Sequence, residues 1–571
     1  MNYKELYEKW IALGTAEEKA ELISIQNDEN EIKHRFSSYI NFGTGGLRGF
    51  MNSGMNSMNV RTVALATQAI CDLIAECGRK SDGIVVGYDS RNNSEIFAKK
   101  TASVAAANGV KTYIFDGLRP TPELSFAIRE LGCVAGVNIT ASHNPKEYNG
   151  YKAYWDDGAQ LPPEHAETVA ERMKQIDIFS EICDCDFDQA VADGKITVIG
   201  DSIDEVYMQN VLAERIYPEA VAKASDDLRI VYTPLHGAGR ILVPEVLRRS
   251  GIKHIYTVDE QMIPDGDFPT VKKPNPENAD VFNIGVKLAD EVNSDLIIAT
   301  DPDADRVGVM IRGNDGKFIT ITGNQMGAML LEYILCAYEE TGTMPVEPYA
   351  VKTIVTTPLA ESICKDHGVT LYNVLTGFKF IGEVIKEQEK AEKKTTFVFG
   401  FEESYGYLKG TYARDKDSVV AAMLIAEMTC FYKLKGKNLY DALASLYEKY
   451  GYYLERNAEL VFTGHDGAEK MAAIMQKLRN SPPASLGQKK IVSISDYLTK
   501  QTTDLITNEV TPITLPTSNV LYFVLEGNDV VVIRPSGTEP KIKIYYLLSA
   551  PTSEEANASF EAYKKDFESL V

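Results

Sequence analysis

Three aspartates stand at alternate positions in the segment DPDADRVGV. Asp301, Asp303 and Asp305 follow an apolar run, and three carboxylates this close together repel one another unless a cation lies among them. Oxygen ligands of this kind suit Mg²⁺. A calcium loop of the EF-hand type is excluded because Arg306 replaces the glycine at its sixth position and Arg312 replaces the glutamate at its twelfth. We expect a magnesium site here, with a solvated acidic turn as the alternative.

A serine in the segment ITASHNPKEYNGYKAYW is the second chemical group. His143 is next to Ser142, but adjacent side chains on an extended segment point to opposite sides, so we expect His143 to be badly placed as a base for a Ser–His–Asp hydrolase. The nucleophile elbow G-x-S-x-G is also absent. We predict instead that Ser142 carries a phosphoryl group, while Lys152 manages a proton. A turn at Asn149–Gly150 is expected to bring Lys152 back towards Ser142.

The segment RPSGTEPKIKIYY has the composition of a phosphate clamp. Gly537 lets backbone N–H groups turn inward to form an anion nest, and Arg534 and the hydroxyls of Ser536 and Thr538 add donors. An ordinary β-turn is the alternative. The segment GFEESYG supplies Glu402 and Ser404, a carboxylate and a hydroxyl that can bind the hydroxyl groups of a sugar.

Three further cations stand in conspicuous loops. Lys379 lies in TGFKFIGE, Arg414 lies in TYARDKDS near an expected helix start, and Arg48 follows the glycine cluster of FGTGGLRG. Lys379 and Arg414 could instead be ordinary surface charges. The glycine cluster could cradle a phosphate, but it does not match G-x-x-x-x-G-K-[ST], so a nucleotide P-loop is excluded.

These loops follow short apolar runs that alternate with helical patterns. The runs are residues 83–91, 136–145, 228–239, 295–306 and 396–406, and the helical patterns include residues 96–109 and 241–251. This alternation predicts α/β domains with parallel or mixed sheets, in which ligands gather at the carboxyl ends of strands. After about residue 440 the pattern changes to strands at 520–527, 529–537 and 542–549 and a closing helix from Ser553. We expect domains of residues 1–200, 201–314, 315–445 and 446–571.

Composition narrows the class of protein. The chain has 571 residues, a net charge of −22 and a hydrophobic fraction of 44%, so it is expected to form several globular domains and not to bind nucleic acid. No apolar run is long enough for a membrane helix. The first residues predict an amphipathic helix with Leu6, Trp10 and Leu13 on one side rather than a secretory signal. The eight scattered cysteines contain no CxxC pair, which argues against zinc and favours the cytoplasm.

Four long segments in this order resemble the α-D-phosphohexomutases. They are TASHNPKEYNGYK, DPDADRVGV, GFEESYG and RPSGTEPKIKIYY, supported by FGTGGLRG, GYDSRNNS, RPTPELSFA, YTPLHGAG, PDGDFPTVKKPNPE and TGFKFIGE. The resemblance covers residues 41 to 550 and is greatest to the phosphoglucomutase branch, which also includes phosphopentomutases. It implies three similar α/β domains and a smaller C-terminal α+β domain around a central cleft.

The resemblance also implies roles for these residues. Ser142 matches the phosphoserine, and it completes the Mg²⁺ shell of Asp301, Asp303 and Asp305. Lys152, Arg48 and His143 join Ser142 as catalytic candidates, although hydrogen bonds that order their loops are the expected role of His143 and of His236. The substrate-binding candidates are Arg306, Lys379, Glu402, Ser404, Arg414, Arg534, Ser536, Gly537 and Thr538.

The expected reaction converts glucose 1-phosphate into glucose 6-phosphate. Phospho-Ser142 gives its phosphoryl group to a sugar monophosphate, and glucose 1,6-bisphosphate is both intermediate and activator. A pentose or mannose phosphate is the alternative substrate. Two other classes stay open: a magnesium-dependent phosphatase with Asp301 or Asp303 as nucleophile, and a sugar-phosphate binding protein without activity.

Overall fold

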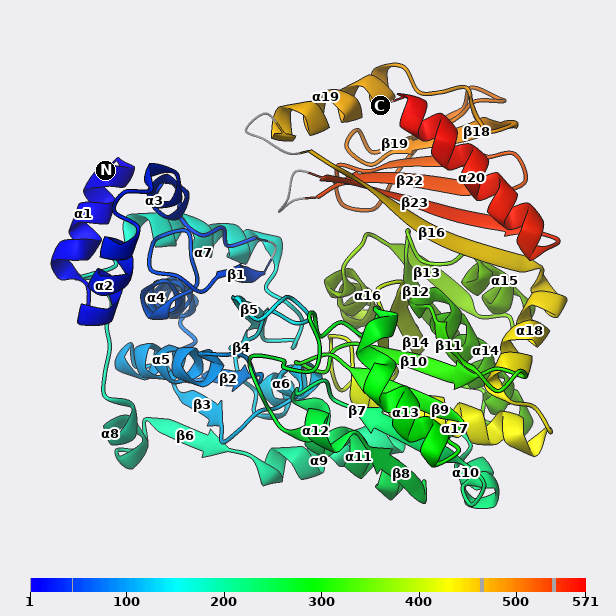
Figure 1. Ribbon diagram of the computed structural model, residues 1–571, viewed down its shortest axis with the longest axis horizontal. Helices are drawn as coiled ribbons and strands as arrows, with labels where there is room; N and C mark the ends of the chain where they lie inside the picture. The colour runs from blue at the N-terminus through cyan, green and yellow to red at the C-terminus, as the bar shows by residue number, and fades with distance from the viewer. Residues whose placement is uncertain (1, 44, 463–466, 537–540, 571) are drawn as a thin grey trace. The chain divides into compact units, whose positions relative to one another are not determined.

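The computed structural model describes residues 2–43, 45–462, 467–536 and 541–570. The chain forms two compact units (Figure 1). The first contains residues 1–321, 385–390 and 405–435, and the second contains residues 322–384, 391–404 and 436–571. Each unit has its own buried apolar clusters.

The first sheet of the first unit has six strands in the order β1-β5-β4-β2-β3-β6. Its central strands β2, β3 and β4 are parallel, whereas β5 is antiparallel to β4 and β1. Strands β2 and β4 are buried at every position, which is typical of a parallel sheet covered on both faces. The strands are β1 (Gly46–Phe50), β2 (Ile84–Tyr88), β3 (Thr112–Phe115), β4 (Ala135–Ile139), β5 (Tyr148–Trp155) and β6 (Ile196–Ile199). The helices are α4 (Val60–Glu76), α5 (Ser94–Ala107), α6 (Thr121–Glu130), α7 (Pro163–Gln175) and α8 (Phe187–Ala192).

Three short helices precede this sheet: α1 (Tyr3–Leu13), α2 (Ala16–Ser24) and α3 (Glu29–Phe36). Trp10 is fully buried and packs edge-on against Phe36 and Phe179. The expected helix is therefore present, but its predicted apolar face is only partly buried because Leu13 is 54% exposed.

The second sheet of the first unit has the order β11-β10-β9-β7-β8. Strand β7 is parallel to β8 and β9, and β10 turns back antiparallel to β9. The strands are β7 (Arg229–Thr233), β8 (His254–Thr257), β9 (Leu296–Thr300), β10 (Val307–Arg312) and β11 (Phe318–Ile321). The other elements of this part are α9 (Asp201–Ala213), α10 (Pro218–Ala224), α11 (Gly239–Ser250), α12 (Asp259–Met262), η1 (Ala279–Phe282), α13 (Asn283–Glu291), β15 (Gly406–Leu408) and α17 (Ser418–Leu434).

The second unit begins with a parallel arrangement in the order β13-β12-β14. The strands are β12 (Pro348–Thr353), β13 (Thr370–Val374) and β14 (Thr396–Glu402), and the helices are α14 (Gly323–Thr341), α15 (Leu359–Asp366) and α18 (Leu439–Tyr450). Helix α16 (Phe378–Lys390) contributes residues to both units.

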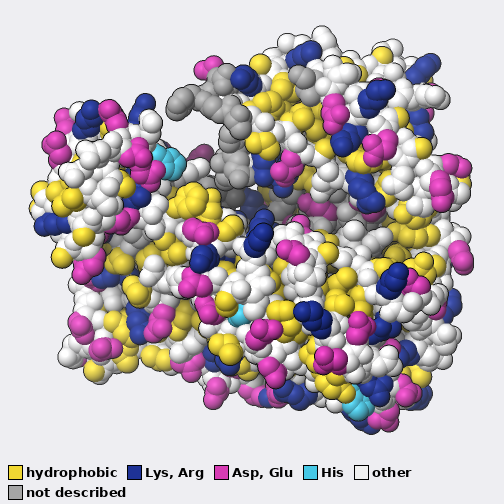
Figure 2. Space-filling view, in the orientation of Figure 1, with side chains coloured by type: hydrophobic (Ala, Val, Ile, Leu, Met, Phe, Trp, Pro, Cys, Tyr) yellow, Lys and Arg dark blue, Asp and Glu magenta, His cyan; other side chains and the backbone are white. Residues whose placement is uncertain are grey.

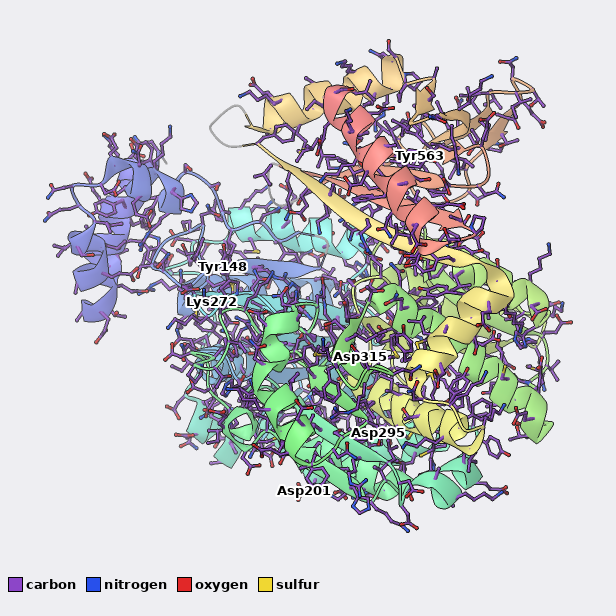
Figure 3. All side chains as sticks on the ribbon, turned by 45° about the vertical axis from the view of Figure 1, so that its right-hand side comes forward. Tyr148, Asp201, Lys272, Asp295, Asp315 and Tyr563 are labelled. Atoms are coloured by element: carbon purple, nitrogen blue, oxygen red, sulfur yellow. The ribbon has the colours of Figure 1, made fainter. Side chains whose placement is uncertain are left out.

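An antiparallel sheet in the order β16-β23-β22-β21-β18-β19-β20 forms the C-terminal part of the second unit. Helices α19 (Gly467–Asn480) and α20 (Ser553–Leu570) pack against it (Figure 1). Tyr563, which Figure 3 labels on α20, donates a hydrogen bond to Asp529 at 2.7 Å. The strands are β16 (Tyr452–Val461), β17 (Ser485–Leu486, paired with β18), β18 (Lys489–Asp496), β19 (Gln501–Asp504), β20 (Val510–Pro512), β21 (Leu521–Leu525), β22 (Val530–Pro535) and β23 (Lys541–Ala550).

The expected fold class is confirmed: three α/β parts with parallel or mixed sheets precede a C-terminal part rich in strands. Acidic and basic side chains are interspersed on the face seen in Figure 2, so the net charge of −22 is not gathered in one patch there. Among the described residues, no helix combines the length and the apolar character needed to cross a membrane.

Candidate active site

Ser142 lies in the loop between β4 and β5, at the carboxyl end of a buried strand. Its φ is +52°, in the left-handed region that costs a non-glycine residue about 1–3 kcal/mol. Its N–H donates to Thr140 Oγ1 at 2.8 Å, and only 2% of the residue is exposed. The loop therefore holds the serine backbone in a strained, buried conformation that the surrounding contacts must maintain.

Arg91, which follows β2, makes most of the hydrogen bonds that hold the serine loop in this conformation. Its guanidinium donates to four backbone carbonyl oxygens of the serine loop: those of Ser142, Asn144 (2.6 Å), Pro145 (3.0 Å) and Tyr148 (3.1 Å). Asp89 pairs with Arg91 Nε at 3.3 Å, and both side chains are completely buried. A planar guanidinium can serve several acceptors at once in a way that an ammonium cannot. Figure 3 labels Tyr148, the last of the four, where β5 begins.

Asp301, Asp303 and Asp305 lie in the tight loop between β9 and β10, and each is at most 2% exposed. Asp301 Oδ2 accepts the hydroxyl of Ser142 at 2.8 Å, and Asp301 Oδ1 accepts the N–H of Arg306 at 3.0 Å. The loops after two strands of different sheets, β4 and β9, thus meet within the first unit. The fold brings together the serine and the acidic cluster that the sequence singled out.

Two lysines bind the acidic loop. Nζ of Lys152, on β5, lies 2.7 Å from Asp303 Oδ2 and 2.9 Å from Asp305 Oδ2. Nζ of Lys416 lies 3.3 Å from Asp305 Oδ2. Although burial opposes the charge, Asp303 and Asp305 raise the pKa of Lys152. Burial would raise the pKa of Asp305, but Lys152 and Lys416 outweigh it and hold that pKa below its usual range. Burial and the two neighbouring carboxylates raise the pKa of Asp301 well above its usual value.

The three aspartates fit a hard divalent cation. Asp303 Oδ1 and Asp305 Oδ1 are buried and accept no hydrogen bond from the residues that the structure describes. One oxygen from each of the three carboxylates lies within 4.8 Å of the others. A buried carboxylate oxygen without a donor is costly, and a bound cation offsets that cost. A donor set made only of oxygen suits Mg²⁺ better than a softer metal.

Two neighbouring segments position the acidic loop. Thr121, at the start of α6, donates to Asp303 twice: from its hydroxyl to Oδ2 at 2.8 Å and from its N–H to the carbonyl oxygen at 2.8 Å. Gly237 permits the segment YTPLHGAG to pack on the loop, because a Cβ there would lie 2.4 Å from Pro302 Cα. The next residue, Ala238, donates its N–H to Pro302 O at 2.7 Å.

The two histidines of these loops differ in their contacts. The His236 ring binds a backbone carbonyl and a threonine hydroxyl at 2.9 and 2.8 Å, the expected loop-ordering role. The expectation that His143 points away from Ser142 is wrong, because His143 Nδ1 lies 3.2 Å from Ser142 Oγ. The left-handed backbone at Ser142 is the reason, since only an extended segment sends adjacent side chains to opposite sides. Burial, with the positive charges of Arg306 and Arg48, lowers the pKa of His143 well below its usual value.

The predicted turn at Asn149–Gly150 is also wrong. Both residues lie within β5, and residues 140–147 form the connection from β4. A Cβ at Gly150 would lie 2.4 Å from Thr140 O, so this glycine permits a close approach of two backbones rather than a turn. Lys152 still reaches the acidic loop because it stands on the strand that returns beside β4.

Arg48, Arg306 and Arg414 have distinct surroundings in the first unit. Arg48 of β1 donates to Asn144 Oδ1 at 3.4 Å, next to the serine loop. Arg306 donates to Glu277 at 2.6 Å. The guanidinium of the buried Arg414 binds Glu389 and the carbonyl oxygens of Thr411 and Ala413. In the segment TYARDKDS it is Lys416, not Arg414, whose cation contacts the acidic cluster.

The remaining candidates lie in the second unit. Glu402 ends β14 and is buried, and Ser404 follows it, partly exposed. Lys379 stands in the first turn of α16 with its ammonium 5.1 Å from the ring centroid of Phe380. Arg534 lies near the end of β22, and the N–H of Ser536 donates to Lys541 O at 2.8 Å. Gly537 and Thr538 lie outside the described residues.

Comparison with known families covers most of this fold. The chain matches the description "Phosphoglucomutase/phosphomannomutase, alpha/beta/alpha domain I" over residues 40–178, domain II over residues 205–314 and domain III over residues 322–450. The chain belongs to the phosphoglucomutase/phosphomannomutase family. The resemblance to the α-D-phosphohexomutases is thereby confirmed, and this phosphohexomutase is an enzyme of the phosphotransferase and isomerase type.

Individual relatives of this phosphohexomutase are similar over almost their whole length. A protein of Staphylococcus saprophyticus named phosphoglucomutase is 36% identical over 539 residues, which cover 94% of this chain and 95% of that protein. The phosphoglucomutase of Staphylococcus aureus strain USA300 is 35% identical over 540 residues, 94% of each chain. The open form of parafusin, a phosphoglucomutase of Paramecium, shares the fold at 17% identity with a TM-score of 0.67, covering 93% of this chain and 94% of that one.

Proposed function

We propose that this phosphohexomutase interconverts α-D-glucose 1-phosphate and glucose 6-phosphate through a phosphoserine at Ser142. The observation that carries the proposal is the 2.8 Å hydrogen bond from the Ser142 hydroxyl to Asp301 of the acidic cluster. A serine held in a strained loop beside three buried carboxylates has no apolar packing role. The names of the relatives with about 35% identity support glucose as the sugar.

Asp301, Asp303 and Asp305 would hold Mg²⁺, with an oxygen of phospho-Ser142 beside them. When bound, the ion neutralises charge on the transferring phosphoryl group. Lys152 and Lys416 already pair with Asp303 and Asp305, so the chain itself brings two further positive charges to the same place. In this proposal Arg48 and Arg306 bind the substrate near the transferring group.

The reaction proceeds in two transfers. A hydroxyl oxygen of the sugar phosphate forms a bond to phosphorus while the bond from phosphorus to Ser142 Oγ breaks, and glucose 1,6-bisphosphate results. The Lys152 ammonium would donate a proton to the departing Ser142 Oγ and take up the proton of the attacking hydroxyl, and His143, 3.2 Å from Ser142 Oγ, orders the loop. The bisphosphate then reverses its orientation, and its other phosphoryl group passes to Ser142, so that phosphate is neither gained nor lost overall.

We also propose sugar-phosphate contacts for residues of the second unit. We propose that Glu402 and Ser404 bind sugar hydroxyls, and that the phosphate which is not transferred binds Arg534, Ser536, Gly537 and Thr538, with Lys379 beside the sugar. Among the substrate-binding candidates of the first unit, we replace Arg414 with Lys416, because the Arg414 guanidinium is engaged by Glu389 and two backbone carbonyl oxygens.

A coupled assay tests the substrate. The purified chain with Mg²⁺ and a trace of glucose 1,6-bisphosphate is given glucose 1-phosphate, mannose 1-phosphate or ribose 1-phosphate, and both the 6- or 5-phosphate product and free phosphate are measured. The proposal expects the glucose ester to be converted with the highest kcat/KM and no stoichiometric release of phosphate. Ser142→Ala should be inactive, whereas Ser81→Ala, at an exposed serine of the same α/β part, should retain activity.

Phosphomannomutase activity is the second candidate, because the family description that matches the chain includes it. A higher kcat/KM for mannose 1-phosphate than for glucose 1-phosphate would favour it. Release of one phosphate for each sugar phosphate consumed would instead favour a phosphatase and contradict the phosphoserine mechanism.

A further inference from the structure

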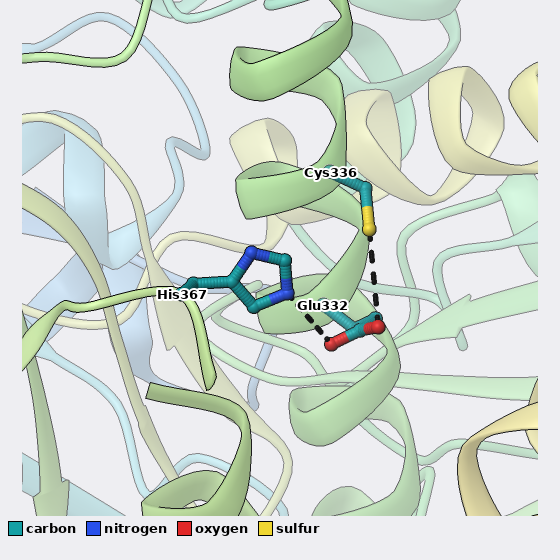
Figure 4. Close-up of side chains that lie close together, drawn as sticks. All are labelled: Glu332, Cys336 and His367. Atoms are coloured by element: carbon teal, nitrogen blue, oxygen red, sulfur yellow. Dashed lines mark hydrogen bonds and ion pairs between the residues drawn. The ribbon is translucent and has the colours of Figure 1, made fainter. Parts of the chain in front are cut away.

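A second group of metal-ligating side chains lies in the second unit, on elements that carry none of the proposed catalytic residues. Glu332 and Cys336 stand one turn apart on the same face of α14, and His367 follows α15 as its C-cap residue. Figure 4 shows the three side chains converging. The Glu332 and His367 side chains are only 8% and 5% exposed.

The ligand atoms of the three side chains lie near one another, although not yet at the spacing of a tetrahedral metal site. His367 Nε2 lies 3.3 Å from Glu332 Oε2, and Cys336 Sγ lies 3.8 Å from Glu332 Oε1. Zinc bonds of about 2.0 Å to nitrogen or oxygen and about 2.3 Å to sulfur place neighbouring tetrahedral ligands roughly 3.3 to 3.5 Å apart. One ligand atom from each residue lies within 4.8 Å of the others. Because the two measured pairs use different oxygens of Glu332, the carboxylate would have to turn to bring one oxygen beside both His367 Nε2 and Cys336 Sγ.

A carboxylate stands behind the histidine, as is usual for a metal ligand. His367 Nδ1 lies 2.7 Å from Glu339 Oε1, one further turn along α14. A carboxylate on Nδ1 fixes the tautomer that leaves Nε2 for a metal and raises the basicity of the ring. Glu339 therefore has the place of a residue that orients a ligand.

The groups that now bind Glu332 have another partner. Lys449 Nζ lies 3.1 Å from Glu332 Oε1 and Tyr450 OH lies 3.0 Å from Oε2, but both also bind Asp366, at 2.7 and 3.0 Å. Asp366 can retain these two donors when Glu332 turns to a metal. The positive charge of Lys449 offsets part of the negative charge of the ligands.

We propose that Glu332, Cys336 and His367 bind Zn²⁺, with a water molecule as the fourth ligand. A thiolate and an imidazole select a softer metal than the three aspartates of the active site do. Zinc here would join α14 to the segment after α15. This proposal departs from the expectation that the scattered cysteines argue against zinc. The ligands comprise one cysteine, one histidine and one glutamate, and only the fold brings them together over a separation of thirty-odd residues.

The competing interpretation is a cluster of ion pairs. In it a protonated His367 lies between Glu332 and Glu339, and hydrogen bonds to Cys336, Glu332 and Glu339 raise the pKa of His367 to about 10 against the effect of burial. Metal binding requires the imidazole and the thiol to lose their protons. Only the zinc site contains a bond from a metal to the Cys336 thiolate, and absorption spectroscopy detects such a bond.

Cobalt substitution decides between them. The full-length protein is stripped with a chelator, given excess Mg²⁺ to fill the aspartate cluster, and titrated with Co²⁺. The proposal expects one Co²⁺ per chain with a thiolate-to-cobalt charge-transfer band and the visible absorption of tetrahedral cobalt, both removed by added Zn²⁺. No thiolate band in the wild type would overturn it.

Variants identify the cysteine that gives rise to the charge-transfer band. Cys336→Ser should abolish it, whereas Cys183→Ser, at an exposed cysteine, should leave it intact. Glu339→Gln should retain the band but weaken Co²⁺ binding by roughly 10- to 100-fold. Zn²⁺ should raise the thermal midpoint of the wild type and not that of Cys336→Ser, and turnover with Mg²⁺ should be equal in the two. A band that persists in Cys336→Ser would refute the proposal, and Glu339→Gln provides a test if Cys336→Ser fails to fold.

Discussion

Replacing Arg91 with lysine keeps the positive charge beneath the serine loop but removes the planar set of donors that the guanidinium provides. The guanidinium donates four hydrogen bonds to backbone carbonyl oxygens and pairs with the buried Asp89. A lysine keeps the charge but cannot serve acceptors spread over Ser142 to Tyr148 with one ammonium, so at least two of these bonds are lost. At about 1.5 kcal/mol for each hydrogen bond to a charged group, the loss is about 3 kcal/mol or more.

This loss of free energy would destabilise the loop that must hold the phosphoserine. Ser142 occupies a left-handed backbone conformation that its neighbours maintain, so loss of two bonds lets the loop relax. About 3 kcal/mol corresponds to a decrease of roughly 10²-fold in the rate of phosphorylation of Ser142, if the loss applies to the reactive conformation. The rate is measured by intact mass after mixing Arg91→Lys with glucose 1,6-bisphosphate and Mg²⁺.

Arg312→Lys is the matched control, because Arg312 also donates to backbone carbonyl oxygens, those of Ser294, Gly316 and Ala289, but does not contact the serine loop. It should lower stability while phosphorylation remains at the wild-type rate. If Arg91→Lys is phosphorylated as fast as the wild type, or if the two variants lose the same activity, the role assigned to Arg91 is wrong.

Three further predictions concern the metal loop and the phosphate clamp. Thr121→Val removes the hydrogen bond from the Thr121 hydroxyl to Asp303 and leaves the buried Asn138 Nδ2 without its acceptor. The free energy of unfolding should therefore fall by about 1–3 kcal/mol, and calorimetry should show weaker Mg²⁺ binding. Thr101→Val, at a buried threonine within α5, should leave Mg²⁺ binding unchanged. Removal of Mg²⁺ with a chelator should abolish turnover, and adding it to 100 times its Kd should stabilise the native state by about 2.7 kcal/mol; an equal gain in Asp303→Asn would contradict the site. Arg534→Ala should raise KM for glucose 1-phosphate about 10-fold or more without slowing phosphorylation of Ser142, and Arg456→Ala, at an exposed arginine of β16, should change neither; an unchanged KM in Arg534→Ala would refute the clamp.

The order of strands and helices could be predicted from the sequence because local patterns determine it. Apolar runs such as residues 295–300 end where polar loops begin, and the structure has β9 at that place. The acidic triad and Ser142 could be selected because a buried strand end is an unusual place for such groups. Their mutual contact depends on the packing of two sheets, which no local pattern reports.

The errors arose where tertiary contacts decide the local conformation. Asn149–Gly150 is a strong turn signal, yet the close approach of Thr140 O requires glycine within a strand. The side chain of His143 approaches Ser142 because the backbone is left-handed there, and that conformation is maintained by Arg91, a residue that lies 51 positions earlier and was not assigned a role. The segment TYARDKDS does not itself distinguish Lys416 from Arg414, because only the fold shows which of its cations contacts Asp305.

Mapping of the phosphoryl group tests whether Ser142 is the phosphorylated residue. The protein is incubated with glucose 1,6-bisphosphate and Mg²⁺, its intact mass is measured, and the modified peptide is identified. The phosphoserine mechanism predicts one added phosphoryl group, on the peptide that contains Ser142, and none in Ser142→Ala. A phosphoryl group on an aspartate of residues 301–305, or an unmodified Ser142 peptide while the enzyme turns over, would contradict the account and favour an aspartyl-phosphate mechanism.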